Sequence, residues 1–437
     1  MNDLRLLKGL LCAVTLSVGS CAFAQRVISL DEIFASAEKS SAQLKPSFSA
    51  ETESALDIEV ARAQRLPEVS ATMSVSFIGD GFITKRNFSG YEKAPIPHLG
   101  TGLEITISQP IYTGGAITSS INLAELKSTA ARFATDLKRD NIRFELTGYY
   151  LDLYKCFNLQ SVVASNIESA KKLLDDMKAR YEQGTVLLND ITRYELLLSN
   201  LELQQVKLSN TIAILNNNLV TLAGLGDSVD IIPDTTILAQ SLPVHGEGWW
   251  QSEAESKAPA LQLARNGVEM SRKAEALVKS DRLPKVGINA GWTMDGPILV
   301  EIPPINRNLS YWYVGVGVSY NISSLYKNNR SVAKSNVATQ KAVYDLDATY
   351  DKINTAVRAD YIRYMESYED LKTQQKSVEL AERNYNTVET RYSEGMALIT
   401  DMLDAADSRL NAQQQLVNAR INIIYYYYKL LFTSGKI

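Results

Sequence analysis

The positions of the prolines constrain this chain more than any other feature of its sequence. The 12 prolines leave two long gaps, one between Pro110 and Pro233 and one after Pro304. Proline inside a helix costs about 3 kcal/mol, because it lacks an N–H and its ring clashes with the preceding turn. In the second gap, apolar and aromatic side chains from Leu346 to Tyr392 recur every three or four residues, which is typical of helices wound against neighbours. The sequence therefore predicts two very long helical hairpins.

The chain also contains an internal duplication. Arg65-Leu66-Pro67 recurs as Arg282-Leu283-Pro284, an offset of 217 positions, and Arg180-Tyr181 with Gly184 recurs as Arg391-Tyr392 with Gly395, an offset of 211. The difference between the two offsets falls in a loop of the first copy. A repeat of this extent predicts one duplicated architecture, with a first repeat at 25–227 and a second at 228–437 that includes the linker.

Each repeat contains two segments in which apolar and polar residues alternate, near 69–77 and 103–110 in the first repeat and near 286–294 and 311–322 in the second. Strict alternation predicts strands with one apolar and one polar face. Their lengths suit a transmembrane strand, which needs about 9–11 residues, although a soluble sheet can show the same pattern. Four strands cannot enclose a polar lumen, so a membrane barrel would need strands from several chains.

The first 24 residues have the features of a secretory signal peptide: a charged start, an apolar stretch, and Ala22-Phe23-Ala24 before the expected cleavage site. A second reading takes the residues before Cys21 as a lipoprotein box, in which case Cys21 would be lipidated. The net charge of −4 supplies no surplus of Lys and Arg for a nucleic-acid partner. We therefore expect an exported protein that does not bind nucleic acid.

Several motifs together carry a family resemblance. They are Ser29-Leu30-Asp31-Glu32 near the start of the mature chain, Arg-Leu-Pro before a strand in each repeat, the run from Gln109 to Gly115 after the second strand, and Arg-Tyr-x-x-Gly followed by Asp at both hairpin tips. Their order, spacing and duplication resemble the TolC-like outer-membrane efflux protein family from about residue 28 to the C-terminus.

The resemblance implies a mainly α fold with a small antiparallel β part. It implies a homotrimer, whose strands form one 12-stranded outer-membrane β-barrel continued by an α-helical barrel in the periplasm of a Gram-negative bacterium. It further implies a passive exit duct in efflux or type I secretion, surrounded by outer-membrane lipid and docked to a periplasmic adaptor and an inner-membrane transporter. No cofactor is expected, and the sequence does not specify whether the cargo is drugs, metals, lipids or proteins.

The hairpin tips near 184–190 and 395–401 are the informative region for such a function. Gly184 and Gly395 end the descending helices, where a left-handed residue favours glycine. The resemblance implies that these tips close the pore and meet the adaptor. Leu187 and Leu398, just after each glycine, are candidate adaptor contacts, although a plain role in helix packing fits them equally well.

Four further residues at the tips are gate candidates. Asp401 and Asp404 share a helix face, and three-fold symmetry would arrange them as a cation-favouring ring of carboxylates. They can also be helix-start acids that complement the macrodipole. The resemblance implies that Tyr392 tethers the closed tip to Asp190. The position of a gate arginine in the family's best-known member is Ala397 here, which puts the rest of that gate network in doubt.

The runner-up interpretation is a soluble periplasmic or surface scaffold of coiled coils without channel activity. An enzyme is not expected, because the sequence has no Gly-x-Ser-x-Gly elbow, no Walker loop and no His-Glu-x-x-His, and Cys156 is the one cysteine of the expected mature chain. Its two histidines, His98 and His245, lie far apart in sequence, so no metal site is predicted.

Overall fold

The computed structural model describes residues 24–226, 229–234, 236, 242–243, 245–301 and 303–437. The predicted signal peptide lies outside these residues except for Ala24, and so do Cys12 and Cys21. The chain divides into two compact units. One comprises the described part of Met1–Lys45 with Lys138–Ala254 and Ala356–Ile437, and the other comprises Pro46–Leu137 with Glu255–Thr355. Each unit combines segments from both halves of the sequence, and the division into repeats at 25–227 and 228–437 stays a prediction.

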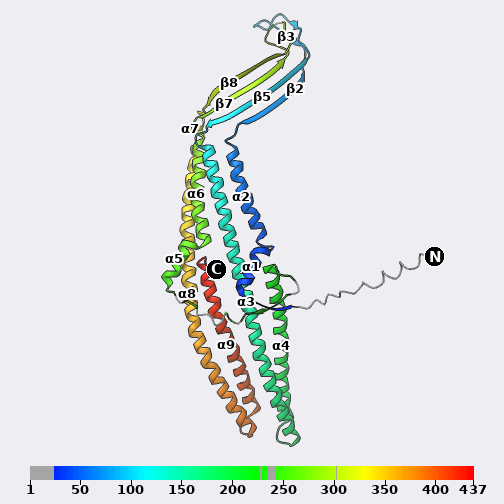
Figure 1. Ribbon diagram of the computed structural model, residues 1–437, viewed down its shortest axis with the longest axis vertical. Helices are drawn as coiled ribbons and strands as arrows, with labels where there is room; N and C mark the ends of the chain where they lie inside the picture. The colour runs from blue at the N-terminus through cyan, green and yellow to red at the C-terminus, as the bar shows by residue number, and fades with distance from the viewer. Residues whose placement is uncertain (1–23, 227–228, 235, 237–241, 244, 302) are drawn as a thin grey trace, which may run out of the picture. The chain divides into compact units, whose positions relative to one another are not determined.

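The unit with Pro46–Leu137 contains an antiparallel four-stranded sheet. Its strands are β2 (Glu68–Phe77), β5 (Leu99–Tyr112), β7 (Lys285–Gly296) and β8 (Leu309–Ser319), in the order β2-β5-β7-β8 (Figure 1). A short hairpin of β3 (Gly81–Ile83) and β4 (Glu92–Ala94) lies within the connection from β2 to β5. The central contact, between β5 and β7, joins the two halves of the chain.

Helices of the same unit flank the strands in sequence. These are α2 (Lys45–Ala63), α6 (Pro259–Ser280), the short α7 (Ser324–Lys327) and the first parts of α3 (Ala116–Glu182) and α8 (Asn329–Ser393). α2 contacts α3 through an ion pair between Arg62 and Glu125, 3.1 Å apart. α6 contacts α3 as well, since the side-chain amide of Asn266 donates to the backbone carbonyl of Leu126 at 2.7 Å.

The other unit is built on two helical hairpins. The second part of α3 returns as α4 (Leu188–Ala223), and the second part of α8 returns as α9 (Ile399–Thr433) (Figure 1). α3 has 67 residues and α8 has 65. At 1.5 Å per residue each is about 100 Å long. The predicted long hairpins are therefore confirmed, and so is the mainly α fold with a small antiparallel β part.

Four elements of this unit had no counterpart among the expected elements: β1 (Ala24–Ile28), α1 (Leu30–Ser40), β6 (Val229–Pro233) and α5 (Glu247–Lys257). β1 pairs with β6 in parallel across about 200 positions, which no local pattern reveals. α1 did carry a local signal. The hydroxyl of Ser29 accepts from the N–H of Glu32, and the carboxylate of Glu32 accepts from the N–H of Ser29, both at 3.3 Å, which is a capping box.

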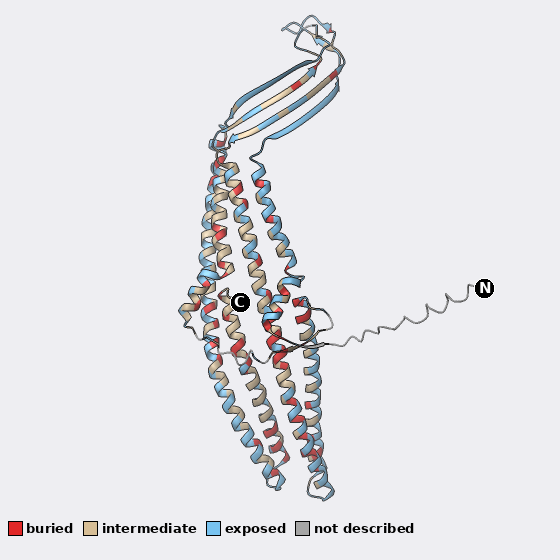
Figure 2. Cartoon of the chain, viewed as in Figure 1, coloured by how far each residue is buried: buried red, intermediate tan, exposed pale blue. Residues whose placement is uncertain are grey.

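The core near the hairpin tips draws on all four long helices. Buried residues recur at intervals along these helices (Figure 2), since only one face of each helix meets its neighbours. The cluster contains Val163, Ile167, Ala170, Leu173, Leu174 and Met177 of α3, Ile191, Tyr194 and Leu201 of α4, Tyr385 and Tyr392 of α8, and Ile399, Met402, Ala405 and Ala406 of α9.

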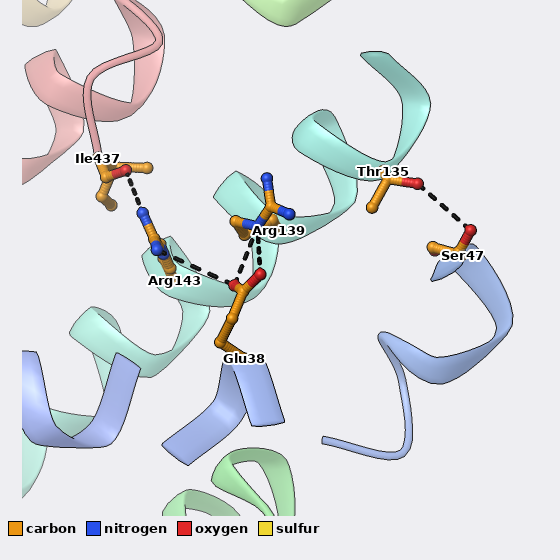
Figure 3. A network of polar contacts seen from close by, with 6 residues as sticks. All are labelled: Glu38, Ser47, Thr135, Arg139, Arg143 and Ile437. Carbon is orange, nitrogen blue, oxygen red and sulfur yellow. Dashed lines mark hydrogen bonds and ion pairs between the residues drawn. The ribbon is translucent and has the colours of Figure 1, made fainter. Parts of the chain in front are cut away.

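A polar network ties the end of the chain to α1 and α3 (Figure 3). The guanidinium of Arg139 donates to both carboxylate oxygens of Glu38 at 2.9 Å. Arg143 lies 3.9 Å from the same carboxylate and donates to the terminal oxygen of Ile437 at 2.9 Å. Charge-assisted bonds of this kind are stronger than neutral ones. They hold the end of the chain after α9 against α1 and α3.

Candidate functional site

The four-stranded sheet has one apolar face and one polar face. The register pairs Val69 with Ile107 and Ile288 with Val316, so apolar side chains stand beside apolar ones across the strands. The apolar face consists of Val69, Ala71, Met73, Val75 and Phe77 of β2, Leu103, Ile105 and Ile107 of β5, Val286, Ile288, Ala290, Trp292 and Met294 of β7, and Trp312, Val314, Val316 and Val318 of β8.

This apolar face is largely uncovered in the single chain. Met73 is 77% exposed and Trp312 is 74% exposed. Contiguous apolar surface of this extent is rare on soluble proteins and marks a surface that meets lipid or another protein. The predicted alternation thus has a structural counterpart on every strand of the sheet.

The opposite face is lined mainly by hydroxyls, amides and glycines. The Ser70 and Thr106 hydroxyls are 2.6 Å apart across β2 and β5, and the Thr293 hydroxyl donates to the Asp295 carboxylate at 2.6 Å. The ring of Tyr313 covers Gly291, where a β-carbon would come within 2.6 Å of it. This face suits water rather than a hydrocarbon environment.

The two outer strands leave sheet edges open. Within the described residues β2 pairs only with β5, and β8 pairs only with β7. Each outer strand therefore presents unpaired N–H and C=O groups along one side. An edge of this kind invites pairing with a strand of another chain.

Both hairpin tips have the same backbone geometry. Gly184 has φ +76° and Gly395 has φ +74°. The N–H of Thr185 donates to the carbonyl of Arg180 at 3.0 Å, and the N–H of Met396 donates to the carbonyl of Arg391 at 2.7 Å. This pattern is a Schellman cap, which explains the requirement for glycine at both tips.

Leu187 and Leu398 occupy equivalent positions directly before the returning helices. Their backbones are extended, with φ −86° and −85°, and each side chain is 69% exposed. Neither residue packs into the core near the tips, so each tip presents an uncovered leucine. Ala397, at the position of the family's gate arginine, is only partly buried and packs against the core cluster.

Tyr392 and Asp190 are neighbours without a hydrogen bond between them. The Tyr392 hydroxyl is buried and has no hydrogen-bond partner among the described residues. Burial raises the pKa of Tyr392, and the charge of the nearby Asp190 carboxylate raises it further. The structure therefore brings the two residues of the expected tether together, while leaving the hydroxyl unsatisfied in this arrangement of the tips.

Asp401 and Asp404 take different roles within one chain. The Asp401 carboxylate accepts from the backbone N–H of Leu398 at 3.1 Å and so caps α9, as a helix-start acid would. Asp404, one turn further on, is exposed. Burial raises the pKa of Asp407, and the Asp404 carboxylate adds to this rise. The sequence reasoning missed Asp407, although its three-residue spacing from Asp404 was visible.

Arg180 connects the two tips. Its guanidinium lies 3.1 Å from the Asp176 carboxylate on its own helix and donates to the backbone carbonyl of Ser393 on the other hairpin. A cleft of about 770 Å³ lies between the tips, lined among others by Arg180, Leu187, Asp190, Tyr392, Ala397 and Leu398. These six residues, most of them gate or docking candidates, therefore line the same cleft.

A polar layer, here called the Arg409 layer, interrupts the apolar core above the tips. It consists of Asn166 on α3, Tyr194 on α4, Tyr385 on α8 and Arg409 on α9. The Arg409 guanidinium stacks on the Tyr385 ring at 3.5 Å from its centre and donates to the Asn166 side-chain oxygen at 2.9 Å. Burial raises the pKa of Tyr194, and the nearby Tyr385 raises it further. The layer links all four helices, and no sequence pattern marked it.

In the part of the chain that the structure describes, no helix combines the length and the apolar character needed to cross a bilayer. The same residues contain no cluster of three or more His, Cys, Asp or Glu side chains arranged to hold a metal ion.

Comparison with known proteins finds a family that this chain resembles. Residues 250–425 match the outer membrane efflux protein family. The outer membrane protein TolC of Vibrio cholerae serotype O1 is 22% identical over 415 residues, which cover 94% of this chain and 91% of that protein. TolC of Escherichia coli K12 is 21% identical over 373 residues, 75% of this chain and 72% of that protein. The chain is therefore similar, over most of its length, to the TolC-like outer-membrane efflux proteins.

Solved structures show the same fold. The outer-membrane channel OprN superposes with a TM-score of 0.78 at 16% identity, over 93% of this chain and 90% of that one. The outer membrane protein VceC of Vibrio cholerae superposes with a TM-score of 0.76 at 16% identity, over 93% and 96%. The expected fold class is thereby confirmed, and the sequence matches confirm the expected family resemblance.

Two conclusions follow for this TolC-like protein. It is located in the outer membrane with its helical part in the periplasm, as expected. It acts as an outer-membrane efflux channel, and the family that it resembles is one of channels rather than enzymes.

Proposed function

We propose that three copies of this chain form one passive exit duct, docked to a periplasmic adaptor and an inner-membrane transporter. The amphipathic sheet with two open edges is the observation that carries the proposal. In hydrocarbon every unpaired backbone group costs several kcal/mol, so a sheet in a membrane must close on itself. Four strands are too few to enclose a polar lumen, whereas three copies supply twelve.

Conductance tests this proposal. The purified protein should run as a trimer in detergent and should form pores in a planar lipid bilayer. A well-folded trimer that forms no pores would refute the duct. A protein that leaves cells with the soluble periplasmic fraction, without detergent, would instead support a coiled-coil scaffold.

We propose that the hairpin tips form the periplasmic gate, with Tyr392 and Asp190 as its tether. The buried, unpartnered Tyr392 hydroxyl supports this role, because leaving such a group unsatisfied costs about 1–3 kcal/mol. A small rearrangement that brought the Asp190 carboxylate into hydrogen-bonding distance would remove this cost and favour one position of the tip. Tyr392→Phe and Asp190→Ala should then both raise single-channel conductance. Unchanged conductance in both variants would contradict the tether.

We propose that Asp401 and Asp404 of the three chains form a ring of six carboxylates at the constriction of the trimer. Such rings favour cations over anions. The Asp401→Asn, Asp404→Asn double variant should shift the reversal potential in a salt gradient toward the unselective value. Glu104→Gln, which removes one carboxylate from the polar face of the sheet, is the control for a loss of charge elsewhere. Equal shifts in the two proteins would contradict a selectivity ring at the tips.

The exposed leucines support a docking role for Gly184–Asp190 and Gly395–Asp401. Adaptor contacts at both tips would cover Leu187 and Leu398, which the chain itself leaves open. Leu187→Asp with Leu398→Asp should abolish co-purification of a cross-linked adaptor and leave bilayer conductance intact. Retained co-purification would contradict docking through these side chains.

A further inference from the structure

The connection between β2 and β5 is the part of the sheet that the duplication does not explain. The offset between the two repeats is 217 before this connection and 211 after it, so the first copy is longer by 217 − 211 = 6 residues. The β3–β4 hairpin lies within this connection. In the shorter connection between β7 and β8, the described residues form a single isolated bridge, between Ile298 and Ile305. Joining two strands of this sheet therefore does not require the extra length, and the hairpin calls for another role.

The β3–β4 hairpin lies at the end of the sheet that is remote from the helices (Figure 1). α2 leads into β2, and α3 follows β5, at the end where Glu68 pairs with Ser108. At the opposite end Phe77 pairs with Leu99, and the hairpin lies between these two residues in sequence. Because the helical part is in the periplasm, the hairpin is on the outer side of the membrane. The outer leaflet of such a membrane consists largely of phosphorylated glycolipid.

The turn of this hairpin is held in one conformation by hydrogen bonds. The N–H of Lys85 donates to the carbonyl of Ser89 at 2.9 Å, and the N–H of Phe88 donates to the carbonyl of Lys85 at 2.8 Å. The side-chain oxygen of Asn87 accepts from the N–H of Ser89 at 3.2 Å and from its hydroxyl at 2.7 Å. This is an Asx turn, in which a side chain takes the place of a backbone group. The turn therefore presents its exposed side chains on a preformed scaffold.

Phe88, in this turn, is unusual in two respects. Its φ is +60°, the one positive value among the described residues other than glycine. Bulky residues avoid this region, which glycine and asparagine adopt more readily. Its side chain is 90% exposed, so packing within the chain does not offset the cost. A backbone cost without internal compensation points to a role for the ring outside the chain.

The same turn is positively charged. Lys85 and Arg86 are both exposed, and residues 84–91 contain no Asp or Glu. Lys93, on β4, is in a different situation, because its ammonium group lies 3.0 Å from the Asp80 carboxylate. Two cations beside an exposed aromatic ring match a membrane surface, where phosphate groups lie next to hydrocarbon.

We propose that this turn inserts Phe88 among the lipid head groups around the protein and binds their phosphates through Lys85 and Arg86. Aromatic rings favour the boundary between hydrocarbon and water, and a guanidinium can bind phosphate through two parallel hydrogen bonds. The turn extends the apolar face of the sheet, which ends at Phe77, 81% exposed. The inference goes beyond the proposed duct, since it requires the outer-membrane location but neither the trimer nor the gate.

Binding of lipid A, a glycolipid with two phosphate groups, tests the proposal. The full chain, solubilised in detergent and immobilised on beads, should retain lipid A from mixed micelles, and mass spectrometry measures the amount bound. Lys85→Gln with Arg86→Gln should weaken binding about 30-fold, because each cation near an anionic surface contributes about fivefold. Lipid A from which both phosphates have been removed should bind the unaltered protein at least about tenfold more weakly than lipid A itself. Equal binding of the two lipids would overturn the proposal.

Phe88→Gly separates lipid contact from a structural role. Glycine adopts a positive φ freely, and loss of an exposed ring removes no packing, so the thermal unfolding midpoint should not fall. Binding of lipid A should nevertheless weaken about tenfold, because the apolar area that the ring buries among lipids is lost. Val300→Gly is the matched control, since Val300 is 93% exposed in the β7–β8 connection and is followed by Glu301. Binding that is unchanged in Phe88→Gly, or equally weakened in both variants, would overturn the role of the ring.

A second double variant controls for the loss of charge. Arg330→Gln with Lys334→Gln removes two exposed cations from α8 and should leave lipid A binding unchanged. Equal weakening in the two double variants would reveal attraction by overall charge and overturn the site. Bilayer conductance separates this inference from the proposed duct. A protein that forms pores but does not discriminate the two lipids would overturn the lipid site alone, whereas one that binds lipid A through the turn but forms no pores would overturn the duct alone.

Discussion

Gly224 offers the sharpest test of the packing described here. It closes α4 in the left-handed conformation, with φ +67°, and a β-carbon there would stand 2.7 Å from both the carbonyl carbon and the carbonyl oxygen of Ser40. Gly184 has a similar φ of +76°, but no described atom lies within 4 Å of the β-carbon it would gain. Alanine at either position meets the same conformational penalty, and only Gly224→Ala also forces backbone atoms apart.

The two penalties can be estimated separately. A left-handed alanine costs about 1–2 kcal/mol, of which about 0.4–1 kcal/mol is offset because alanine restricts the unfolded chain. Gly184→Ala should therefore lower the free energy of unfolding by no more than about 1.5 kcal/mol per chain. Overpacking against Ser40 adds about 1–3 kcal/mol, so Gly224→Ala should lower the free energy of unfolding by about 1–4.5 kcal/mol.

Thermal unfolding of the detergent-solubilised protein, followed by far-UV circular dichroism at one heating rate, compares the variants. Asparagine tolerates the left-handed conformation but keeps a β-carbon. Gly184→Asn should therefore recover most of the lost stability, whereas Gly224→Asn should recover only the conformational part and keep the cost of overpacking against Ser40. Equal midpoints for Gly184→Ala and Gly224→Ala would refute the close approach of α4 to the end of α1.

Three further predictions concern groups near the tips and on α3. Burial and the Asp404 charge raise the pKa of Asp407, so the stability it contributes is complete below about pH 3.9 and is lost as pH rises through the raised pKa. Asp407→Asn should thus raise the unfolding midpoint at pH 7 but not at pH 3, and a pH-independent difference would contradict this. Burial also raises the pKa of the Cys156 thiol. A maleimide should therefore label Cys156 in the native protein far more slowly than it labels the introduced cysteine of Leu398→Cys. Similar labelling rates would contradict the burial of Cys156. Arg409→Lys keeps the charge but loses the planar stack on Tyr385 and the hydrogen bond to Asn166, so it should lower the free energy of unfolding by about 1–3 kcal/mol. Arg391→Lys, at an exposed position, should change the free energy of unfolding by no more than about 0.5 kcal/mol.

Features set by local sequence could be predicted well. The strand alternation around Val75 and Val316, the glycine caps at Gly184 and Gly395, and the long helices between prolines all depend on periods and backbone conformations within a few residues. The duplication strengthened these predictions, because each pattern occurred twice. α1 was missed although its capping box, Ser29 with Glu32, is equally local.

The candidate site was only partly predictable. Sequence placed Asp190, Tyr392 and Asp401 near the tips, and the structure brings Asp190 and Tyr392 together and gives Asp401 the role of a helix cap. Arg180 was known only as part of a repeated motif, yet it bonds to the opposite tip at Ser393. Whether a tip side chain faces the other hairpin depends on how the four helices pack, which the spacing of residues along one helix does not determine.

The sequence by itself determined which segments are helices and strands, where the chain turns, and that each strand has an apolar and a polar face. Only the tertiary structure decided that β5 lies beside β7, that β1 pairs with β6, and that Arg409 meets Asn166 and Tyr385 in one buried layer. The physical reason is the range of the interactions. Periodicity and backbone conformation are set by neighbours in the chain, whereas these contacts join residues tens to hundreds of positions apart and exist only once the helices and strands have packed.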